Sequence, residues 1–318
     1  MTSPRLSTAR LHRRDFCRGA IGLVVATGGC GQSFTGDRAP ELVWGRIGIS
    51  DGRFQKSRAI TIDDEDHLYI VDMTARIQVF DRDGKFLRVW QTPVHTNGRP
   101  TGLSMSRDGL VMVADTHYYR VLFYTRDGQL RDELTIGGTM GPGPGEFGFV
   151  TDVAQDSAGN YYVSEYGEYD RIQMFSPDRE FLLEWGGHGE EPGQFARPQC
   201  MVFTDDDRLI VADSCNHRIQ IFDTAGKLLD IWGTQGHAPG QLSYPYGLAL
   251  DGRGHVYISE YGNHRVQKLT LAGKSIATWG HQGRHPGELF NPWSLVYDSQ
   301  GRIHVLDSMN HRVQRMVV

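Results

Sequence analysis

An arginine recurs along this 318-residue chain at intervals of 44, 51, 47, 47 and 47 residues. The six positions are Arg76, Arg120, Arg171, Arg218, Arg265 and Arg312. A second series, mostly tryptophan, has intervals of 46, 46, 49, 47 and 47: Trp44, Trp90, Ile136, Trp185, Trp232 and Trp279. Two independent series with one period indicate a repeat protein, so the chain length does not by itself predict two domains.

Each repeat reads as four short strands separated by turn signals. In the fifth repeat we expect strands at Gly247–Asp251, His255–Glu260, Arg265–Thr270 and Ser275–Gly280. The chain holds 39 glycines and 13 prolines, which suits many turns better than long helices. Four-stranded units of 40 to 50 residues are typical of a β-propeller.

The two ends of the repeat region predict how the ring closes. The last repeat stops at Val318, after its third strand, while Glu41–Ile47 has the pattern of a fourth strand with no repeat of its own. We therefore predict an all-β fold: a six-bladed β-propeller with four antiparallel strands per blade, whose last blade is closed by the N-terminal strand.

Three repeats share the motif Asn-His-Arg-Ile/Val-Gln, at Asn216–Gln220, Asn263–Gln267 and Asn310–Gln314. Four segments, PGEF, PGQF, PGQL and PGEL, precede the first strands of repeats three to six. These residues resemble the NHL repeat family, in a bacterial exported or lipoprotein form, over residues 41–318. The resemblance implies a six-bladed propeller.

Residues 1–30 read as an export signal. Arg13 and Arg14 precede a modestly apolar run, which resembles a twin-arginine signal, and Thr27–Cys30 resembles a lipoprotein box. We expect lipidation at Cys30 and a flexible tether over residues 31–40, followed by the propeller at 41–318. The alternative is a cleaved, soluble precursor. The protein is thus predicted to be exported, either periplasmic or anchored in the membrane by lipid only.

Removing the predicted signal changes the charge and the cysteine count. The signal holds five arginines and one aspartate, so residues 31–318 carry −5 − 4 = −9. Such an acidic chain is a poor partner for nucleic acid, whose affinity depends on basic contacts to phosphate. Cys200 and Cys215 remain, and we expect two buried free thiols, with one disulfide as the alternative.

The repeated histidines His217, His264 and His311 are not expected to share a metal. Corresponding positions on neighbouring blades lie on the order of 10 Å apart, whereas zinc requires nitrogens at roughly 2.0–2.1 Å. We expect these imidazoles to bond turn backbone. The repeated arginines each follow an acid, which predicts a carboxylate–arginine pair in every blade, and the tryptophans are expected to wedge between blades.

Positions that differ between repeats are better candidates for a site. The first strand of each blade should begin at the central channel, where the aligned residues are Arg58, Thr101, Thr151, Gln199, Tyr246 and Trp293. Arg99, Arg197, Tyr166 and Tyr261 are expected nearby. A mixture of aromatic, arginine and amide side chains is typical of a recognition surface. The alternative is that these residues only fill the channel.

An enzyme on the same face remains an alternative. The peptidyl-hydroxyglycine amidating lyases, which resemble this architecture, place zinc-binding histidines at the channel, and lactonase-like propellers gather acids there for calcium. The triplets at Pro100, Pro198, Pro245 and Pro292 contain no histidine, and Asp152 is the only acid at or beside the ring. No catalytic residue, metal ligand or cofactor is therefore predicted, although zinc and calcium stay open.

The sequence favours a monomeric binding scaffold for a protein, peptide or glycan of the cell envelope, with no nucleic-acid partner.

Overall fold

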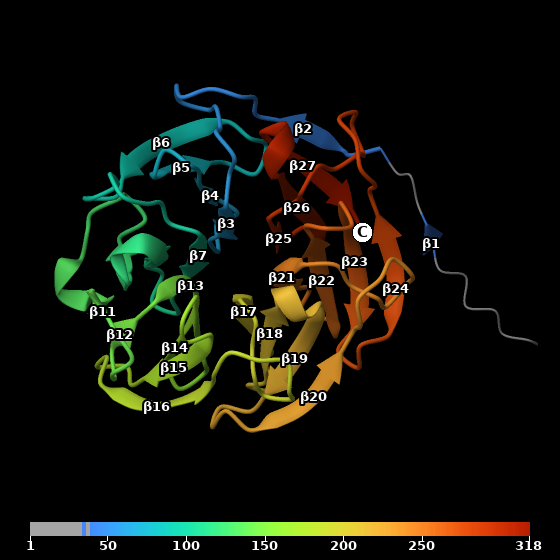
Figure 1. Ribbon diagram of the computed structural model, residues 1–318. Helices are drawn as coiled ribbons and strands as arrows, with labels where there is room; N and C mark the ends of the chain where they lie inside the picture. The colour runs from blue at the N-terminus through green and yellow to red at the C-terminus, as the bar shows by residue number, and fades with distance from the viewer. Residues whose placement is uncertain (1–33, 36–38) are drawn as a thin grey trace, which may run out of the picture. The chain divides into compact units, whose positions relative to one another are not determined.

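The chain forms a six-bladed β-propeller. This computed structural model describes residues 34–35 and 39–318, so the predicted signal and Cys30 lie outside the described residues. Six antiparallel sheets of four strands surround a central axis, with β3, β7, β13, β17, β21 and β25 innermost in Figure 1. The predicted fold class is confirmed. Among the described residues, no helix has the length and apolar character needed to span a bilayer.

The first three blades follow one another along the chain. Blade 1 comprises β3 (Ala59–Ile62), β4 (Leu68–Val71), β5 (Arg76–Phe80) and β6 (Phe86–Gln91). Blade 2 comprises β7 (Gly102–Met105), β8 (Val111–Asp115), β9 (Arg120–Tyr124) and the two-residue β10 (Ile136–Gly137). Blade 3 comprises β13 (Phe149–Gln155), β14 (Tyr161–Tyr166), β15 (Arg171–Phe175) and β16 (Phe181–Gly186). A parallel pair, β11 (Thr139–Met140) and β12 (Glu146–Phe147), connects blades 2 and 3.

The last three blades contain the three complete motifs. Blade 4 comprises β17 (Pro198–Phe203), β18 (Leu209–Asp213), β19 (Arg218–Phe222) and β20 (Leu228–Trp232). Blade 5 comprises β21 (Pro245–Leu250), β22 (His255–Glu260), β23 (Arg265–Thr270) and β24 (Ser275–Trp279). Blade 6 comprises β25 (Ser294–Tyr297), β26 (Arg302–Asp307), β27 (Arg312–Val317) and β2 (Leu42–Trp44).

Short helices and one extra strand complete the fold. The 3-10 helices are η1 (Thr116–Tyr118), η2 (Asp132–Leu134), η3 (Ser214–Asn216) and η4 (Ser308–Asn310). In the segment expected to be a tether, β1 (Phe34–Thr35) pairs in parallel with β24.

The N-terminal strand closes the ring as predicted, but it is shorter than expected. Strand β2 runs beside β27 (Figure 1), with Trp44 opposite Val313 in antiparallel register. The strand ends at Trp44 rather than Ile47, because Gly45 takes a φ of 90° and turns the chain out of the sheet. Ile47 instead forms a parallel bridge with Phe54.

A buried carboxylate and an arginine join the second and third strands of each blade. In blade 4, Arg218 donates from Nε to Asp213 (2.7 Å) and from a terminal nitrogen to the carbonyl of Gln194 (2.8 Å). Gln220 donates to the same carbonyl (2.7 Å), and Asn216 donates to Asp213 (2.9 Å). The motif therefore holds the loop that leads into its own blade, because the Gln194 carbonyl belongs to that loop.

All six predicted pairs are present. Their N–O distances are Arg76–Asp72 3.6 Å, Arg120–Asp115 2.9 Å, Arg171–Glu165 2.6 Å, Arg218–Asp213 2.7 Å, Arg265–Glu260 2.6 Å and Arg312–Asp307 2.7 Å. The longest lies in blade 1, where the motif is degraded and Thr74 stands between the two groups, accepting from Arg76 (2.7 Å).

The motif histidines bond backbone, as predicted, and the backbone belongs to the next blade. Each Nδ1 accepts one N–H: His217 from Tyr244 (3.1 Å), His264 from Asn291 (3.0 Å) and His311 from Lys56 (3.1 Å). Each histidine has a positive φ of 54° to 56°, which directs its ring across the blade boundary. The imidazoles are thus neutral acceptors that link successive blades.

The tryptophans wedge between blades through a matching glycine. Trp185 of blade 3 lies against Gly226 in the last turn of blade 4, where an added Cβ would be 2.6 Å from its ring. Trp44, Trp90 and Trp232 meet Gly84, Gly128 and Gly273 in the same way. Six apolar clusters, one at each blade boundary, form the core.

We expect Gly226→Ala to destabilise the propeller by about 1–3 kcal/mol more than Gly240→Ala, because only the first adds an overpacking clash. The two glycines have φ values of 78° and 82°, and an added Cβ at Gly240 meets nothing within 4 Å. Both variants therefore carry similar backbone strain. Urea unfolding of the two proteins measures the difference, and equal midpoints would contradict the wedge.

We expect the effect of His264→Asn on stability to shrink as pH falls from about 8 to 5. Burial lowers the pKa of His264 from its ordinary value, only partly opposed by Asp307. A lowered histidine pKa gives stability that is present above the unfolded-state pKa and lost as pH falls through the folded-state pKa. The missing hydrogen bond should cost about 1 kcal/mol at pH 8.

Asparagine tolerates the positive φ at position 264, so the comparison isolates the imidazole. The control is His237→Asn, an exposed histidine outside the motif. A difference from wild type that stays constant between pH 8 and 5 would show that the imidazole bond is not what His264 contributes.

Candidate ligand-binding site at the channel mouth

The six first strands enclose a central cavity of about 230 Å³. Its wall runs from Arg58 and Trp293, where the first strands begin, to Ile62 and Tyr297 near their ends. The end that carries Arg58 is called the channel mouth. This is the face at which the aligned positions predicted a ligand site, because each first strand starts there.

Four of the six aligned positions come together at the mouth, where Arg58 and Trp293 are partly exposed and Gln199 and Tyr246 are buried. Arg58, Gln199, Tyr246 and Trp293 all line the cavity. The other two use their hydroxyls within the protein. Thr101 also lines the cavity, but its hydroxyl contacts Thr116 (2.7 Å).

Thr151 contributes to the ring rather than to the cavity wall. It is fully buried, and its hydroxyl bonds the carbonyl of Pro198 in the next blade (2.5 Å). Ser214 makes the corresponding contact one blade later, with the carbonyl of Pro245. These hydroxyls therefore join blades and are poorly placed to meet a ligand.

Three aromatic rings form one wall of the mouth. Tyr246 stacks on Tyr261 with ring centroids 4.8 Å apart and packs edge-on against Trp293 at 5.0 Å. The indole Nε1–H of Trp293 is buried and has no hydrogen-bond partner within residues 39–318. The wall thus offers aromatic surface, with one unused donor buried behind it.

Two guanidinium groups lie over these aromatic rings. Arg197 is 4.6 Å from the ring of Tyr166 and 5.4 Å from that of Tyr246, and Arg58 is 5.6 Å from that of Trp293. Cation–π contacts hold a guanidinium in place while leaving its N–H donors free for a ligand.

The backbone positions Arg197. Its N–H donates to Asp170 of blade 3 (2.8 Å), and its φ is 63°. Asp170 thereby makes the contact that a motif histidine makes at the later boundaries. The side chain of Arg197 is then fixed by Gln199, which accepts from Nε (2.8 Å).

The mouth is positively charged and has no acidic counterpart. Among the described residues, Arg58, Arg99 and Arg197 form no ion pair, in contrast to the six motif arginines. Burial lowers the pKa of Arg58, and the nearby Arg197 and Arg99 lower it further against an opposing effect of Tyr166. Arg99 donates to the carbonyls of Met73 (2.6 Å) and Gly98 (2.7 Å). Arg99 and Arg197 are thus close enough to Arg58 to lower its pKa.

A second ring of variable residues was predicted only in part, through Tyr166 and Tyr261. It follows the second strand of each blade, one or two positions after the motif acid, and contains Met73, His117, Tyr166, Cys215, Tyr261 and Met309. Arg58 and Arg99 both lower the pKa of His117, after burial, and Arg197 acts on Cys215. A similar test to that used for the first ring, a repeat position whose residue type varies between blades, identifies these residues.

The cysteines differ in part from expectation. Both are free, but Cys215 is exposed and Cys200 is only partly buried, so the expectation of two buried thiols is wrong for Cys215. The turn of η3 explains the difference, because it places position 215 at the mouth rather than in a blade core.

The donor set at the mouth does not fit zinc. Within the described part of the chain, no three histidine, cysteine or acidic side chains are grouped so as to hold a metal ion. The nearest histidine, His117, neighbours arginines, whose charge opposes a cation.

Comparison with known protein families identifies NHL repeats in this chain. The NHL repeat model matches residues 195–222, 242–269 and 291–316, which lie in blades 4, 5 and 6. The resemblance read from the Asn-His-Arg motif is confirmed for these three repeats. The propeller therefore contains NHL repeats, most clearly in its C-terminal half.

Two curated relatives match part of the chain. Peptidyl-glycine alpha-amidating monooxygenase A of Xenopus laevis is 36% identical over 127 residues, covering 37% of this chain and 14% of that protein. NHL repeat-containing protein 3 of Mus musculus is 30% identical over 160 residues, covering 46% and 45% of the two chains. The matches thus span less than half of either relative.

Among solved structures, a streptogramin B lyase superposes with a TM-score of 0.61. It shares 14% sequence identity, and the match covers 85% of this chain and 95% of the lyase. At this identity the comparison supports the propeller fold.

Proposed function

We propose that this protein is a binding propeller whose channel mouth receives an acidic group of a protein, peptide or glycan ligand. The observation that carries the proposal is the set of three arginines without an acid partner beside an aromatic wall. Guanidinium groups bind carboxylates through paired hydrogen bonds, and the aromatic rings supply surface for the attached apolar or sugar part.

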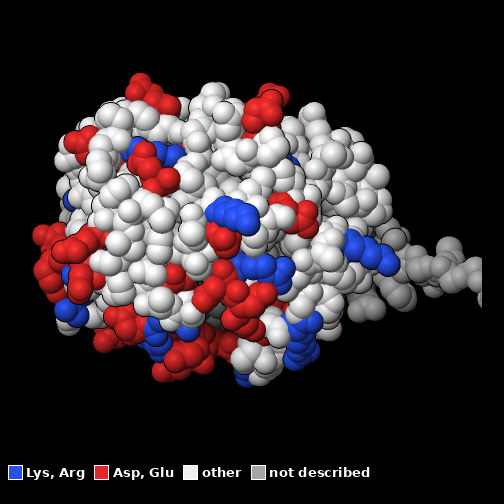
Figure 2. All heavy atoms as spheres, turned by 90° about the horizontal axis from the view of Figure 1, so that it is seen from below, with Lys and Arg blue, Asp and Glu red and all other residues white. Residues whose placement is uncertain are grey.

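The surrounding charge favours a compact acidic group over a polyanion. Residues 31–318 carry a net charge of −9, and Figure 2 shows a side of the molecule where acidic side chains outnumber basic ones. A nucleic acid needs many phosphate contacts along its length, and such a surface repels it. A single carboxylate reaches the mouth arginines without that penalty.

We also propose that the protein works in the bacterial cell envelope as a monomer, attached by lipid at Cys30. The twin-arginine-like signal and the lipoprotein-like Thr27–Cys30 support this placement. Cys30→Ser should shift the protein from the membrane fraction to the soluble fraction when the full chain is expressed with its own signal. Unchanged membrane retention would refute the anchor.

An enzyme at the same mouth is the second candidate. The similarity to peptidyl-glycine alpha-amidating monooxygenases favours it, since these proteins match 37% of this chain at 34–36% identity. The mouth geometry opposes the zinc-dependent version, because arginine, glutamine and aromatic residues occupy the ring where histidines are needed. Stoichiometric zinc or calcium in purified protein, never exposed to chelator, would place this candidate first.

The binding proposal is tested with hexanoate and its neutral counterpart hexanamide as probes. Saturation-transfer NMR should detect hexanoate binding to wild-type protein, with at least tenfold weaker binding of hexanamide. Arg58→Gln should weaken hexanoate binding by about tenfold, which corresponds to about 1.4 kcal/mol.

Arg107→Gln is the matched control, because Arg107 is an exposed arginine at the other end of the first strands. It removes the same charge and should leave hexanoate binding unchanged. Equal binding of hexanoate and hexanamide to wild-type protein, or equal loss in both variants, would refute an anion site at the mouth.

A further inference from the structure

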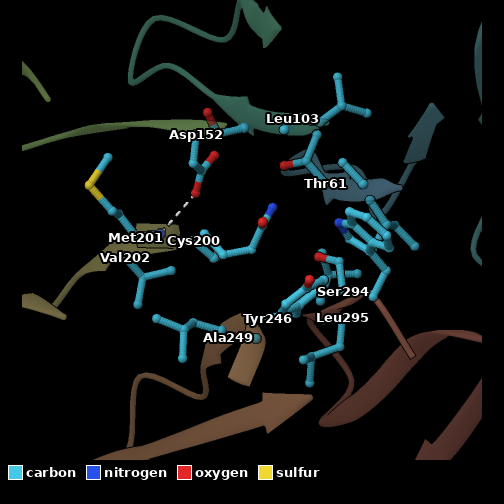
Figure 3. Close-up of a pocket in the computed structure, with 18 of the residues that line it drawn as sticks. Thr61, Leu103, Asp152, Cys200, Met201, Val202, Tyr246, Ala249, Ser294 and Leu295 are labelled. Atoms are coloured by element: carbon cyan, nitrogen blue, oxygen red, sulfur yellow. Dashed lines mark hydrogen bonds between the residues drawn. The ribbon is translucent and has the colours of Figure 1, made fainter. Parts of the chain in front are cut away.

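One acid lines the cavity below the mouth. Asp152 lies on β13, one residue beyond the ring position Thr151, and Figure 3 shows it on the cavity wall beside Cys200 and Met201. Its exposed fraction is 5%. The carboxylate therefore faces a confined space rather than bulk water.

This carboxylate has hydrogen bonds but no cation. Asp152 Oδ2 accepts the backbone N–H of Met201 (2.8 Å), and the Cys200 thiol contributes a further hydrogen bond. Across the described ranges, no lysine, arginine or histidine forms an ion pair with it. The buried motif acid Asp213, by contrast, is paired with Arg218.

Burial without a cation alters the titration of Asp152. Burial raises its pKa to about 7, and the hydrogen bonds from Met201, Val153 and Cys200 oppose the rise only in part. A positive charge placed next to a buried, unpaired carboxylate stabilises its ionised form, since an ion pair offsets the desolvation of the carboxylate.

The cavity is therefore dipolar. Of the side chains that line it, only Arg58 and Asp152 carry charge, and they occupy different depths. The rest of the wall is neutral and includes Thr61, Leu103 and Ser294, all seen around the cavity in Figure 3. A ligand that enters from the mouth meets positive charge first and negative charge further in.

We propose that the ligand is zwitterionic, with its carboxylate on Arg58 and Arg197 and an ammonium group directed into the channel toward Asp152. This inference rests on the proposed binding function and narrows its ligand class. An amino-terminated acid, such as an amino acid, a short peptide or an amino-sugar acid, has this chemistry. The neutral wall accommodates the connecting carbon chain.

An ammonium group suits Asp152 better than a divalent cation does. Calcium requires six to eight oxygen ligands, usually with more than one carboxylate. No other acid lies in the cavity wall, and residues 39–318 offer no three-residue metal group. A single carboxylate is enough to accept a hydrogen bond from an ammonium, which has three donors.

The test uses ω-amino acids that differ in chain length. The probes are 3-aminopropanoate, 4-aminobutanoate and 6-aminohexanoate, with hexanoate lacking the amine and hexylamine lacking the acid. At least one amino acid should bind wild-type protein about tenfold more tightly than hexanoate. Asp152→Asn should abolish the preference for the amino acid over hexanoate, without weakening hexanoate binding, because it removes a negative charge from the cavity.

Asp205→Asn is the matched control. Asp205 is exposed and lines a separate hollow away from the mouth. Each variant replaces one aspartate by asparagine, so the two have the same net charge. It should keep the wild-type preference for the amino acid. Loss of preference in both variants would overturn the assignment to Asp152.

Proton release gives a second readout that needs no variant. Ammonium binding should ionise Asp152, so titration calorimetry near pH 7 should show proton release that differs in heat between phosphate and Tris buffers. Hexanoate should release none. This measurement decides the question if Asp152→Asn fails to fold.

The outcomes separate the two proposals. Equal affinity for hexanoate and all three amino acids, without proton release, would overturn the zwitterion inference and leave the anion site intact. No binding of any carboxylate probe would overturn both. Tight hexylamine binding without any contribution of the carboxylate would overturn the proposed anion site.

Discussion

The carboxylate–arginine pair between the second and third strands is the interaction on which the propeller depends. A buried acid is unfavourable alone, and burial raises the pKa of Asp213, Glu260 and Asp307 despite their partners. The pair is tolerated because each arginine also bonds carbonyls of the loop entering the blade. Breaking one partner would leave an uncompensated charge in the core. The pair therefore fixes loop geometry more than it adds net stability.

Loop geometry in turn fixes the mouth. The loops held by these arginines end where the first strands begin, and those strand starts form the channel entrance. The motif histidines accept a backbone N–H from the loop that enters the next blade. Asp170 makes the same contact at one boundary. Repeated contacts thus form a rigid frame, and the side chains that vary between blades project from it. Such preorganisation lowers the entropy that ligand binding must overcome.

The sequence predicted the frame well because the frame is periodic. In blade 5, two predicted strands match the structure residue for residue, β22 and β23, and the others differ by one or two positions. The closing strand was predicted in the correct place but too long, since a single glycine with positive φ ends it. Blade 2 departs most: its fourth strand, β10, has two residues and no tryptophan.

The candidate site was predictable only in outline. Alignment of the repeats placed Arg58, Gln199, Tyr246 and Trp293 on one ring because equal register brings equal positions to equal radius. It did not distinguish Thr151, whose hydroxyl bonds the next blade, from a side chain facing a ligand. It also overlooked His117 and Cys215, which occupy a second ring. Side-chain direction depends on contacts between blades, and one sequence does not specify them.

The sequence by itself determined the number of blades, the closing strand and the composition of the mouth. Periodicity carries that information, because hydrogen-bond register repeats with the chain. Tertiary structure decided which charges remain unpaired. Six arginines meet acids within their own blades. Among the described residues, Arg58, Arg99 and Arg197 instead meet aromatic rings, amides and carbonyls, and Asp152 meets no cation. Pairing is a matter of distance across blades, and only the closed ring sets that distance.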